Sequence, residues 1–116
     1  MEANLIALLT TLCPRVFFDV APEGTATPYV TLHHIGGKSL RALDGDHCGE
    51  RNTYMQVNVW ASSRLSSMTL ARSIEDALVA SSYFQSVRPD GEPIADHDPD
   101  TNLFGTIQRF SIWATR

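Results

Sequence analysis

The strongest pattern in the chain is a change of hydrophobic period between residues 54 and 78. Over residues 54–60, aliphatic residues alternate with polar and aromatic ones, which is the two-residue period of a strand. Over residues 70–78, apolar residues recur at helical spacings and form one stripe. Ser62 and Ser63 stand between the two patterns, and serine is a favoured helix N-cap. The pattern predicts a strand followed directly by an amphipathic helix that packs back across the sheet.

The rest of the pattern predicts a second helix and more strands. Leucines at helical spacing predict a short amphipathic helix from Glu2 to Leu12, and Pro14 ends it. Further strands are expected at residues 16–18, 28–35 and 103–115, with room for short extra strands between residues 85 and 96.

The predicted fold class is α+β, in the order α-β-β-β-α-β, with two helices packed on one face of a mostly antiparallel sheet. A length of 116 residues fits one domain over residues 1–116. Hydrophobic residues make up 43% of the chain and charged residues 19%, so a packed core is expected rather than disorder.

Two strands carry an unusual second face that is polar in the middle and ends in tryptophan. These faces consist of Tyr54, Gln56, Asn58 and Trp60 in one strand and of Ile107, Arg109, Ser111 and Trp113 in the other. One interpretation is a solvated outer face of the sheet. The other is a subunit interface, because Trp, Tyr and Arg are enriched at such surfaces. The sequence alone does not separate the two.

The histidine and cysteine residues are candidate metal ligands or catalytic groups, but their spacing fits neither role. His33 and His34 point to opposite faces of a strand, so they cannot bind one metal together. His47 and Cys48 match no zinc-ligand spacing, and sequence neighbours are rarely oriented as nucleophile and base. The chain has no nucleophile elbow and no glycine-rich phosphate loop. We therefore expect no enzymatic activity, no metal and no cofactor.

The aspartate-rich segment 96–102 resembles a calcium loop at first sight. A helix-loop-helix calcium site needs Gly at its sixth position and Glu at its twelfth, where this chain has Thr101 and Ile107. The segment is better interpreted as a solvated turn that leads into the last strand.

Charge and cysteine content indicate which partners and which cellular compartment to expect. The net charge is −4 and the nine basic residues are scattered, so no cationic stripe for reading nucleic acid is expected. Two cysteines are too few for a disulfide framework. The start of the chain lacks a basic signal region, and the apolar run at residues 5–12 is too short to span a bilayer. We expect a cytoplasmic product without a membrane segment.

Three stretches, in family order, resemble the phage tail completion proteins. Residues 15–32, RVFFDVAPEGTATPYVTL, are similar to the segment that follows the family's N-terminal helix. Residues 57–62, VNVWAS, resemble its strand before the second helix, and residues 98–113, DPDTNLFGTIQRFSIW, resemble its last strand. The chain has Asn102 where the family often has glycine, and asparagine also suits a left-handed turn.

The resemblance implies a structural protein of a phage or prophage, without catalysis or cofactor. Such proteins cap the end of the tail tube as a ring, usually a hexamer, and join it to the head connector. The implied partners are further copies of the chain, the major tail tube protein and the head connector or neck protein. The implied location is the tail–neck junction of the virion, after synthesis in the host bacterial cytoplasm.

Two sets of residues are predicted to carry this role. The predicted subunit contacts are Gln56, Asn58, Trp60, Arg109 and Trp113. The predicted docking residues are Arg41, Asp44 and Asp46, in a polar loop at residues 38–50 that is richer in His and Asp than the family pattern. The alternative function is a small ligand- or metal-binding regulatory domain of α+β type, which bound zinc or calcium would favour.

Overall fold

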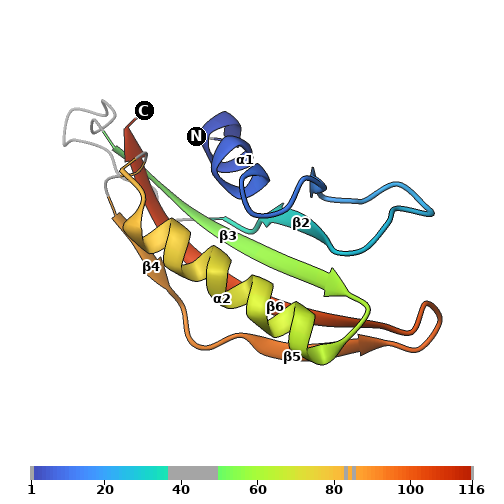
Figure 1. Ribbon diagram of the computed structural model, residues 1–116. Coiled ribbons are helices and arrows are strands. Elements are labelled where there is room, and N and C mark those ends of the chain that lie inside the picture. The colour runs from blue at the N-terminus through green and yellow to red at the C-terminus, as the bar shows by residue number, and fades with distance from the viewer. Residues whose placement is uncertain (1, 37–49, 83, 85, 116) are drawn as a thin grey trace.

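Two long antiparallel strands form the centre of the fold (Figure 1). Strand β3 (Glu50–Ala61) pairs with β6 (Leu103–Thr115) from the pair Glu50–Thr115 to the pair Ala61–Phe104. The computed structural model describes residues 2–36, 50–82, 84 and 86–115. The last strand has the bounds that the sequence predicted.

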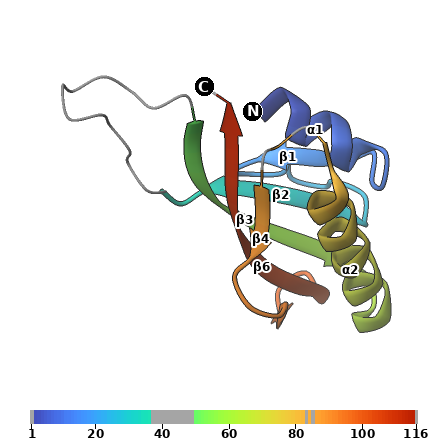
Figure 2. The same cartoon turned by 90° about the vertical axis from the view of Figure 1, so that its left-hand side faces the viewer.

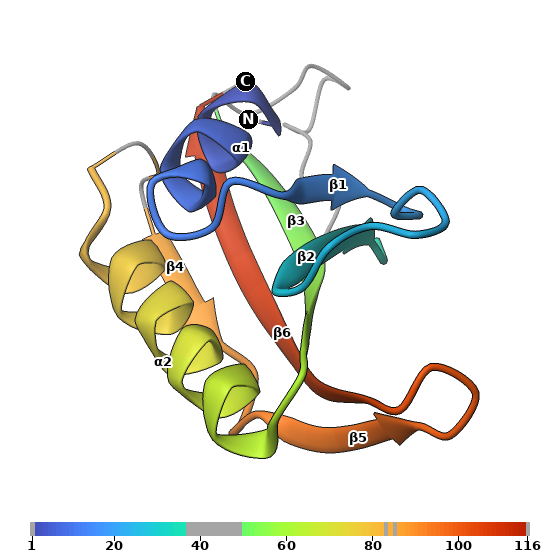
Figure 3. The same cartoon turned by 45° about the vertical axis from the view of Figure 1, so that its right-hand side comes forward.

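The remaining strands extend this pair on both sides. Strand β2 (Tyr29–His34) lies antiparallel to β3, and β1 (Val16–Phe18) lies parallel to β2. On the other side, β4 (Ser86–Pro89) and β5 (Ile94–Asp98) pair with successive parts of β6 (Figure 3). The order is β1-β2-β3-β6-β4, with β5 also on β6, so the predicted mostly antiparallel sheet is confirmed. The extra short strands between residues 85 and 96 are β4 and the start of β5.

Both helices lie on the same face of the sheet, as predicted (Figure 2). Helix α1 (Glu2–Thr10) precedes the sheet in the chain, and α2 (Arg64–Ala80) follows β3 after a two-residue turn. The N-cap of α2 is Ser63, whose side-chain oxygen accepts a hydrogen bond of 3.1 Å from the backbone N–H of Ser66. In the described part of the chain, neither helix is long and apolar enough to cross a membrane.

Helix α1 is shorter than the sequence predicted and ends at Thr10 rather than at Leu12. The hydroxyl groups of Thr10 and Thr11 donate to the backbone oxygens of Ile6 and Leu8, at 2.5 and 2.6 Å. Beyond them, the backbone N–H groups of Leu12 and Cys13 both donate to the Leu9 oxygen, at 3.0 and 2.9 Å, and this tighter turn closes the helix. Leu12 therefore lies beyond the helix and is 38% exposed.

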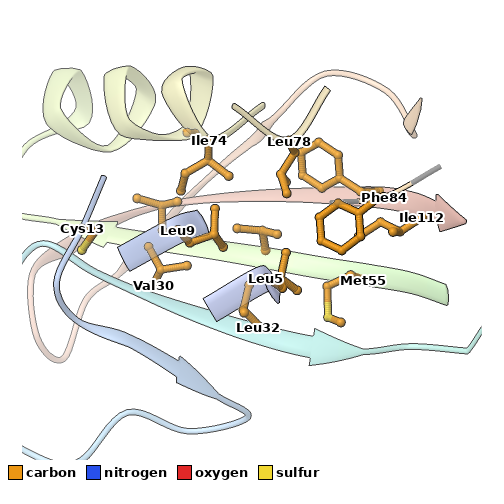
Figure 4. Packing of buried hydrophobic residues seen from close by; sticks show 14 of the residues in the cluster. Leu5, Leu9, Cys13, Val30, Leu32, Met55, Ile74, Leu78, Phe84 and Ile112 are labelled. Atoms are coloured by element: carbon orange, nitrogen blue, oxygen red, sulfur yellow. The ribbon is translucent and has the colours of Figure 1, made fainter. Parts of the chain in front are cut away.

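The core fills the space between the helices and the sheet (Figure 4). Alternate residues of the long strands face it, as the two-residue period predicted. The buried apolar cluster consists of Leu5, Leu9, Cys13, Val30, Leu32, Met55, Val57, Val59, Ala71, Ile74, Leu78, Phe84, Phe110, Ile112 and Ala114. Because this cluster occupies one face only, the opposite face of the sheet takes no part in the core.

Polar contacts fix α2 on the sheet at two levels. Near its start, the buried Ser67 Oγ lies 2.5 Å from Thr106 Oγ1 on β6. Further along, Gln108 Nε2 of β6 donates to Glu75 Oε1 at 2.5 Å and to the backbone oxygen of Gly91 at 3.1 Å. These contacts satisfy buried polar groups, whose free energy would rise if they were left unpaired. They also set the position of α2 along β6.

Strand β5 is attached to the first turn of α2 by one arginine. The Arg64 guanidinium donates to the backbone oxygens of Gly105 and Asp96, both at 2.6 Å. These two residues are register partners in β6 and β5. The same guanidinium lies 5.3 Å from the centre of the Phe104 ring, within cation–π range.

We expect Arg64→Ala to loosen β5 while the rest of the sheet stays folded. Two charge-assisted hydrogen bonds would be lost, which corresponds to a local free-energy change of about 1–3 kcal/mol. Native-state hydrogen exchange should show that the amides of residues 94–98 exchange faster in the variant than in the wild type, while the exchange of the β3 amides is unchanged. Arg72→Ala, at an exposed position of the same helix, is the control. Unchanged exchange in β5 would contradict the prediction.

Candidate subunit interface on the open sheet face

The sheet face opposite the helices is here named the open face. Strand pleating and register place on it every second residue of the strands. It comprises Tyr29, Thr31, His33, Asn52, Tyr54, Gln56, Asn58, Trp60, Ser86, Arg88, Ile94, Asp96, Asp98, Leu103, Gly105, Ile107, Arg109, Ser111 and Trp113. Among the described residues, no helix covers this face. Most of its side chains are only half-buried.

All five residues predicted as subunit contacts lie on the open face, and three of them form one hydrogen-bonded chain. Arg109 Nε donates to Gln56 Oε1 at 3.3 Å, and Gln56 Nε2 donates to Asn58 Oδ1 at 3.1 Å. Arg109 and Gln56 are register partners, so the contact follows from the pairing of β3 with β6. The amide side chains hold each other in place and leave the exposed guanidinium at the centre of the face.

The two predicted tryptophans lie at opposite ends of the open face. Trp113 pairs with Asn52 of β3 and with Ser86 of β4, near the end of β6. Trp60 lies against Gly105, where an added Cβ would be 2.7 Å from the nearest atom of the indole ring. Gly105 therefore provides the space in which this ring can approach the β6 backbone.

Tyr29 is the register partner of Trp60 and lies close enough to Asp98 of β5 to feel its charge. Burial, and to a lesser extent the negative charge of Asp98, raise the pKa of the Tyr29 hydroxyl. A raised pKa means that folding favours the neutral phenol. This contribution to stability is present below the unfolded-state pKa of about 10 and is lost as the pH rises through the folded-state value. At neutral pH Tyr29 is therefore a hydrogen-bond donor at the surface.

Two residues of this region were not predicted from the sequence. Asn52 is 5% exposed, and its Nδ2 donates to Ser111 Oγ at 2.9 Å and to the Ile112 backbone oxygen at 3.3 Å. Gly105 lies inside strand β6, and a glycine inside a strand is a sequence sign that another group approaches the backbone closely. The predicted docking residues Arg41, Asp44 and Asp46 lie outside the described residues.

The comparison with protein families decides the identity of the chain. The family described as tail completion protein gp17 matches residues 2–115. The chain belongs to this tail completion family. It is therefore a phage tail structural protein and a component of the phage virion, which confirms the family predicted from the three sequence stretches.

The fold of this tail completion protein also occurs in a solved virion. A chain in the structure described as "Virion of native gene transfer agent (GTA) particle" matches with a TM-score of 0.59 and 18% identity. The match covers 95% of this chain and 86% of that chain, and at this identity it shows the fold. No curated protein matches the chain.

Only the second part of the aspartate-rich segment of this tail completion protein forms a turn, because residues 96–98 belong to strand β5 and pair with β6. Asp98 Oδ1 accepts a hydrogen bond of 3.0 Å from the backbone N–H of Asp100. Asn102 has a φ of 55°, so the left-handed conformation expected at this position is confirmed. Its side-chain oxygen lies 3.0 Å from His97 Nε2. Over the described ranges, no three His, Cys, Asp or Glu side chains are grouped so that they could hold a metal ion, and His47 and Cys48 lie outside those ranges.

Proposed function

We propose that this protein caps the end of the phage tail tube as a ring and joins the tail to the head connector. One observation carries the proposal beyond the family: the open face presents half-buried Trp60 and Trp113 with the exposed Arg109 between them. Tryptophan and arginine dominate the binding energy of protein interfaces, and here the fold does not use them in its core. We infer that neighbouring copies of the chain contact this face.

The ring that we propose has six copies and stands at the tail–neck junction, after synthesis in the host cytoplasm. Each subunit would contact other copies through Gln56, Asn58, Trp60, Arg109 and Trp113. The hydrogen bonds from Arg109 to Gln56 and from Gln56 to Asn58 support this role, because they order these side chains before binding. Side chains that are already ordered lose less conformational entropy in a complex. The tail tube protein and the head connector would occupy the two sides of the ring.

Deletion of the gene from the source phage or prophage tests the proposal. We expect electron microscopy to show separate full heads and unjoined or abnormally long tails, because the tail end would lack its cap. Supplying the protein from a plasmid should restore joined particles. Normal joined particles after deletion would contradict the proposed function.

The docking role of Arg41, Asp44 and Asp46 is tested in the same complementation assay. We expect Asp44→Lys combined with Asp46→Lys to reduce head joining, because charge reversal opposes a complementary partner surface. Asp100→Lys, which reverses one charge at an exposed position of the turn before β6, is the control and is compared with each single loop reversal. Undisturbed assembly with the doubly reversed loop would remove the loop from the docking surface.

A further inference from the structure

The outer side of α2 is a second exposed surface that carries apolar residues. The helix turns its buried residues toward the sheet, and the residues at helical spacing on the opposite side face away from it. Two of these are apolar, and they are 77% (Leu65) and 53% (Val79) exposed. The whole row, here named the outer stripe, consists of the exposed residues Leu65, Thr69, Arg72, Asp76 and Val79.

The outer stripe and the open face lie on opposite sides of the molecule, because α2 covers the other face of the sheet (Figure 2). They are therefore two different surfaces of one subunit. A contact between two different surfaces repeats from one copy to the next and can close into a ring, whereas a contact of one surface with itself stops at a dimer. The ring proposed above needs such a pair of unlike surfaces, and two open faces packed on each other would not provide it.

Helix α2 and strand β6 run in the same direction, so positions along the two surfaces correspond. Near the start of the helix, Ser67 Oγ lies 2.5 Å from Thr106 Oγ1. Further along both elements, Glu75 Oε1 accepts a hydrogen bond of 2.5 Å from Gln108 Nε2. Each level of the outer stripe therefore has a level of the open face behind it, on the other side of the sheet.

The apolar residues of both surfaces stand at the ends and have similar separations. Leu65 lies in the first turn of α2, which follows the end of β3 at which Trp60 lies. Val79 lies in the last turn, at the end of the core that contains Ile112 (Figure 4). At about 1.5 Å per helical residue, these two aliphatic residues are about 21 Å apart. At about 3.3 Å per strand residue, the rows of Trp60 and Trp113 are about 26 Å apart.

The centres of the two surfaces carry opposite charges. Arg109 is exposed and donates to the neutral amide oxygen of Gln56 at 3.3 Å. Asp76 is exposed and follows Glu75, which binds Gln108, the strand neighbour of Arg109. Helical side chains lean toward the N-terminus of the helix, so Asp76 stands at the level of Arg109. Between the described residues, neither Asp76 nor Arg109 forms an ion pair.

Asp90 reduces the positive charge around Arg109 without cancelling it. Its backbone N–H donates to the Arg109 oxygen at 2.8 Å, and it lines one pocket together with Arg88. The centre of the open face thus combines two arginines with one aspartate. The remaining positive charge is available to the carboxylate of Asp76 from another copy.

The other two positions of the outer stripe suit the rows that they would face. Thr69 is level with the row of Asn58 and Ile107, which is partly polar and partly apolar, and threonine offers both a hydroxyl and a methyl group. Arg72 leans toward the row of Asp96, where its guanidinium would meet an acidic side chain. The match therefore extends along the stripe and is not confined to one pair of charges.

We propose that the outer stripe of one copy packs on the open face of the next copy, with the strands of both copies in the same direction. At the centre, Asp76 pairs with Arg109. At the two ends, the aliphatic residues of the stripe cover the tryptophans. The occupant of the open face is a second copy, because the chain itself carries the opposite charge and the matching apolar ends. The proposal rests on the ring function, and it names the two surfaces that neighbouring subunits would use.

Exchange of the two central charges tests the proposal in complementation of the deletion mutant. Arg109→Asp and Asp76→Arg each bring like charges together between copies, and we expect each alone to reduce the number of joined particles by roughly tenfold or more. The double variant restores opposite charges, so joining should return to within about threefold of wild type. The two residues lie on opposite sides of one subunit, so such a rescue cannot arise within a single chain.

Asp100→Arg is the matched control for this exchange. Asp100 is exposed in the turn before β6 and belongs to neither surface. The control variant alone should leave joining unchanged. Combined with Arg109→Asp it has the same net charge as the double exchange, and it should not restore joining. Thermal unfolding of each purified variant shows whether it is folded.

Leu65→Asp tests one apolar end of the contact independently. The side chain is 77% exposed, so the isolated subunit should stay folded. We expect roughly tenfold fewer joined particles or less than that, because a carboxylate would be buried against the indole of Trp60 in the next copy. Leu65→Met keeps an apolar side chain and should support normal joining.

The failures of the inference and of the ring function look different. Normal particles after deletion of the gene would contradict the ring function, and the inference with it. If deletion prevents joining but the folded single variants still support it, the inference alone is wrong. It is also wrong if the folded double variant fails, or if Asp100→Arg rescues Arg109→Asp equally well. Should an exchanged variant not fold, the comparison of Leu65→Asp with Leu65→Met decides, and equal joining by these two would contradict the inference.

Discussion

Replacing Ile112 by alanine is expected to destabilise the protein by about 2–5 kcal/mol, because it leaves a cavity in the core. Ile112 is fully buried and pairs with Thr53 of β3 and Val87 of β4, in the part of the core that also contains Phe84. A small domain has a total stability of about 5–15 kcal/mol, so the loss is a large fraction of it. Urea unfolding monitored by circular dichroism gives the free energy of unfolding.

Ile107→Ala is the matched control for this prediction. It removes the same atoms from the same strand, but on the open face, where the side chain is only half-buried. We expect a loss well below that of Ile112→Ala, since fewer contacts disappear and water can fill the space. Equal losses for the two variants would show that the open face is packed as tightly as the core.

The strand pattern predicted this difference between the two faces from the sequence alone. The alternation of Met55, Val57 and Val59 with polar neighbours placed the core face of β3 correctly, and Phe110 and Ile112 did so for β6. The sequence predicted a serine N-cap at Ser62 or Ser63, and the structure shows that it is Ser63, whose side chain accepts from a backbone N–H three residues away. Such features are local in the chain, so a period or a cap is enough to reveal them.

Contacts that depend on strand register were not predictable in this way. The bonds from Arg64 to Asp96 and Gly105, and from Gln108 to Glu75, join residues that are far apart in sequence. The parallel pairing of β1 with β2 was also not predicted, because a three-residue strand has too short a pattern to show its partner. Alternation within each strand was enough to predict that the contact residues of one strand share a face. The hydrogen bond from Arg109 to Gln56 could not be predicted, because it depends on the register between β3 and β6.

Register also explains how Arg88 and Asp96 come to lie on the same open face. Arg88 and Asp96 are close in sequence but belong to two short strands that pair with different parts of β6. The sequence predicted that the aspartates of residues 96–102 lie in a solvated turn, and this prediction is correct for Asp100. Only the pairing with β6 places Asp96 on the same surface as Trp60 and Arg109.

Gly105→Ala is expected to displace the Trp60 ring and to cost about 1–3 kcal/mol of stability, because overpacking forces rigid groups apart. The new Cβ would lie 2.7, 2.9 and 3.0 Å from three atoms of the indole six-membered ring. The indole ring is rigid, unlike a flexible lysine side chain. The whole Trp60 ring must therefore rotate away from the β6 backbone. Tryptophan fluorescence in a Trp113→Phe background should shift to longer wavelength as the ring becomes more exposed.

A double-mutant cycle separates this clash from a general intolerance of alanine at position 105. In a Trp60→Ala background the obstacle is gone, and Gly105→Ala should be neutral or slightly stabilising, since alanine restricts the unfolded chain more than glycine does. We expect a coupling energy of about 1–3 kcal/mol between the two positions. Additive effects would mean that the ring does not rest on Gly105. The folded Gly105→Ala variant can also be tested for particle joining. If the coupling is present and joining is reduced, the orientation of the Trp60 ring matters for the proposed contact between subunits.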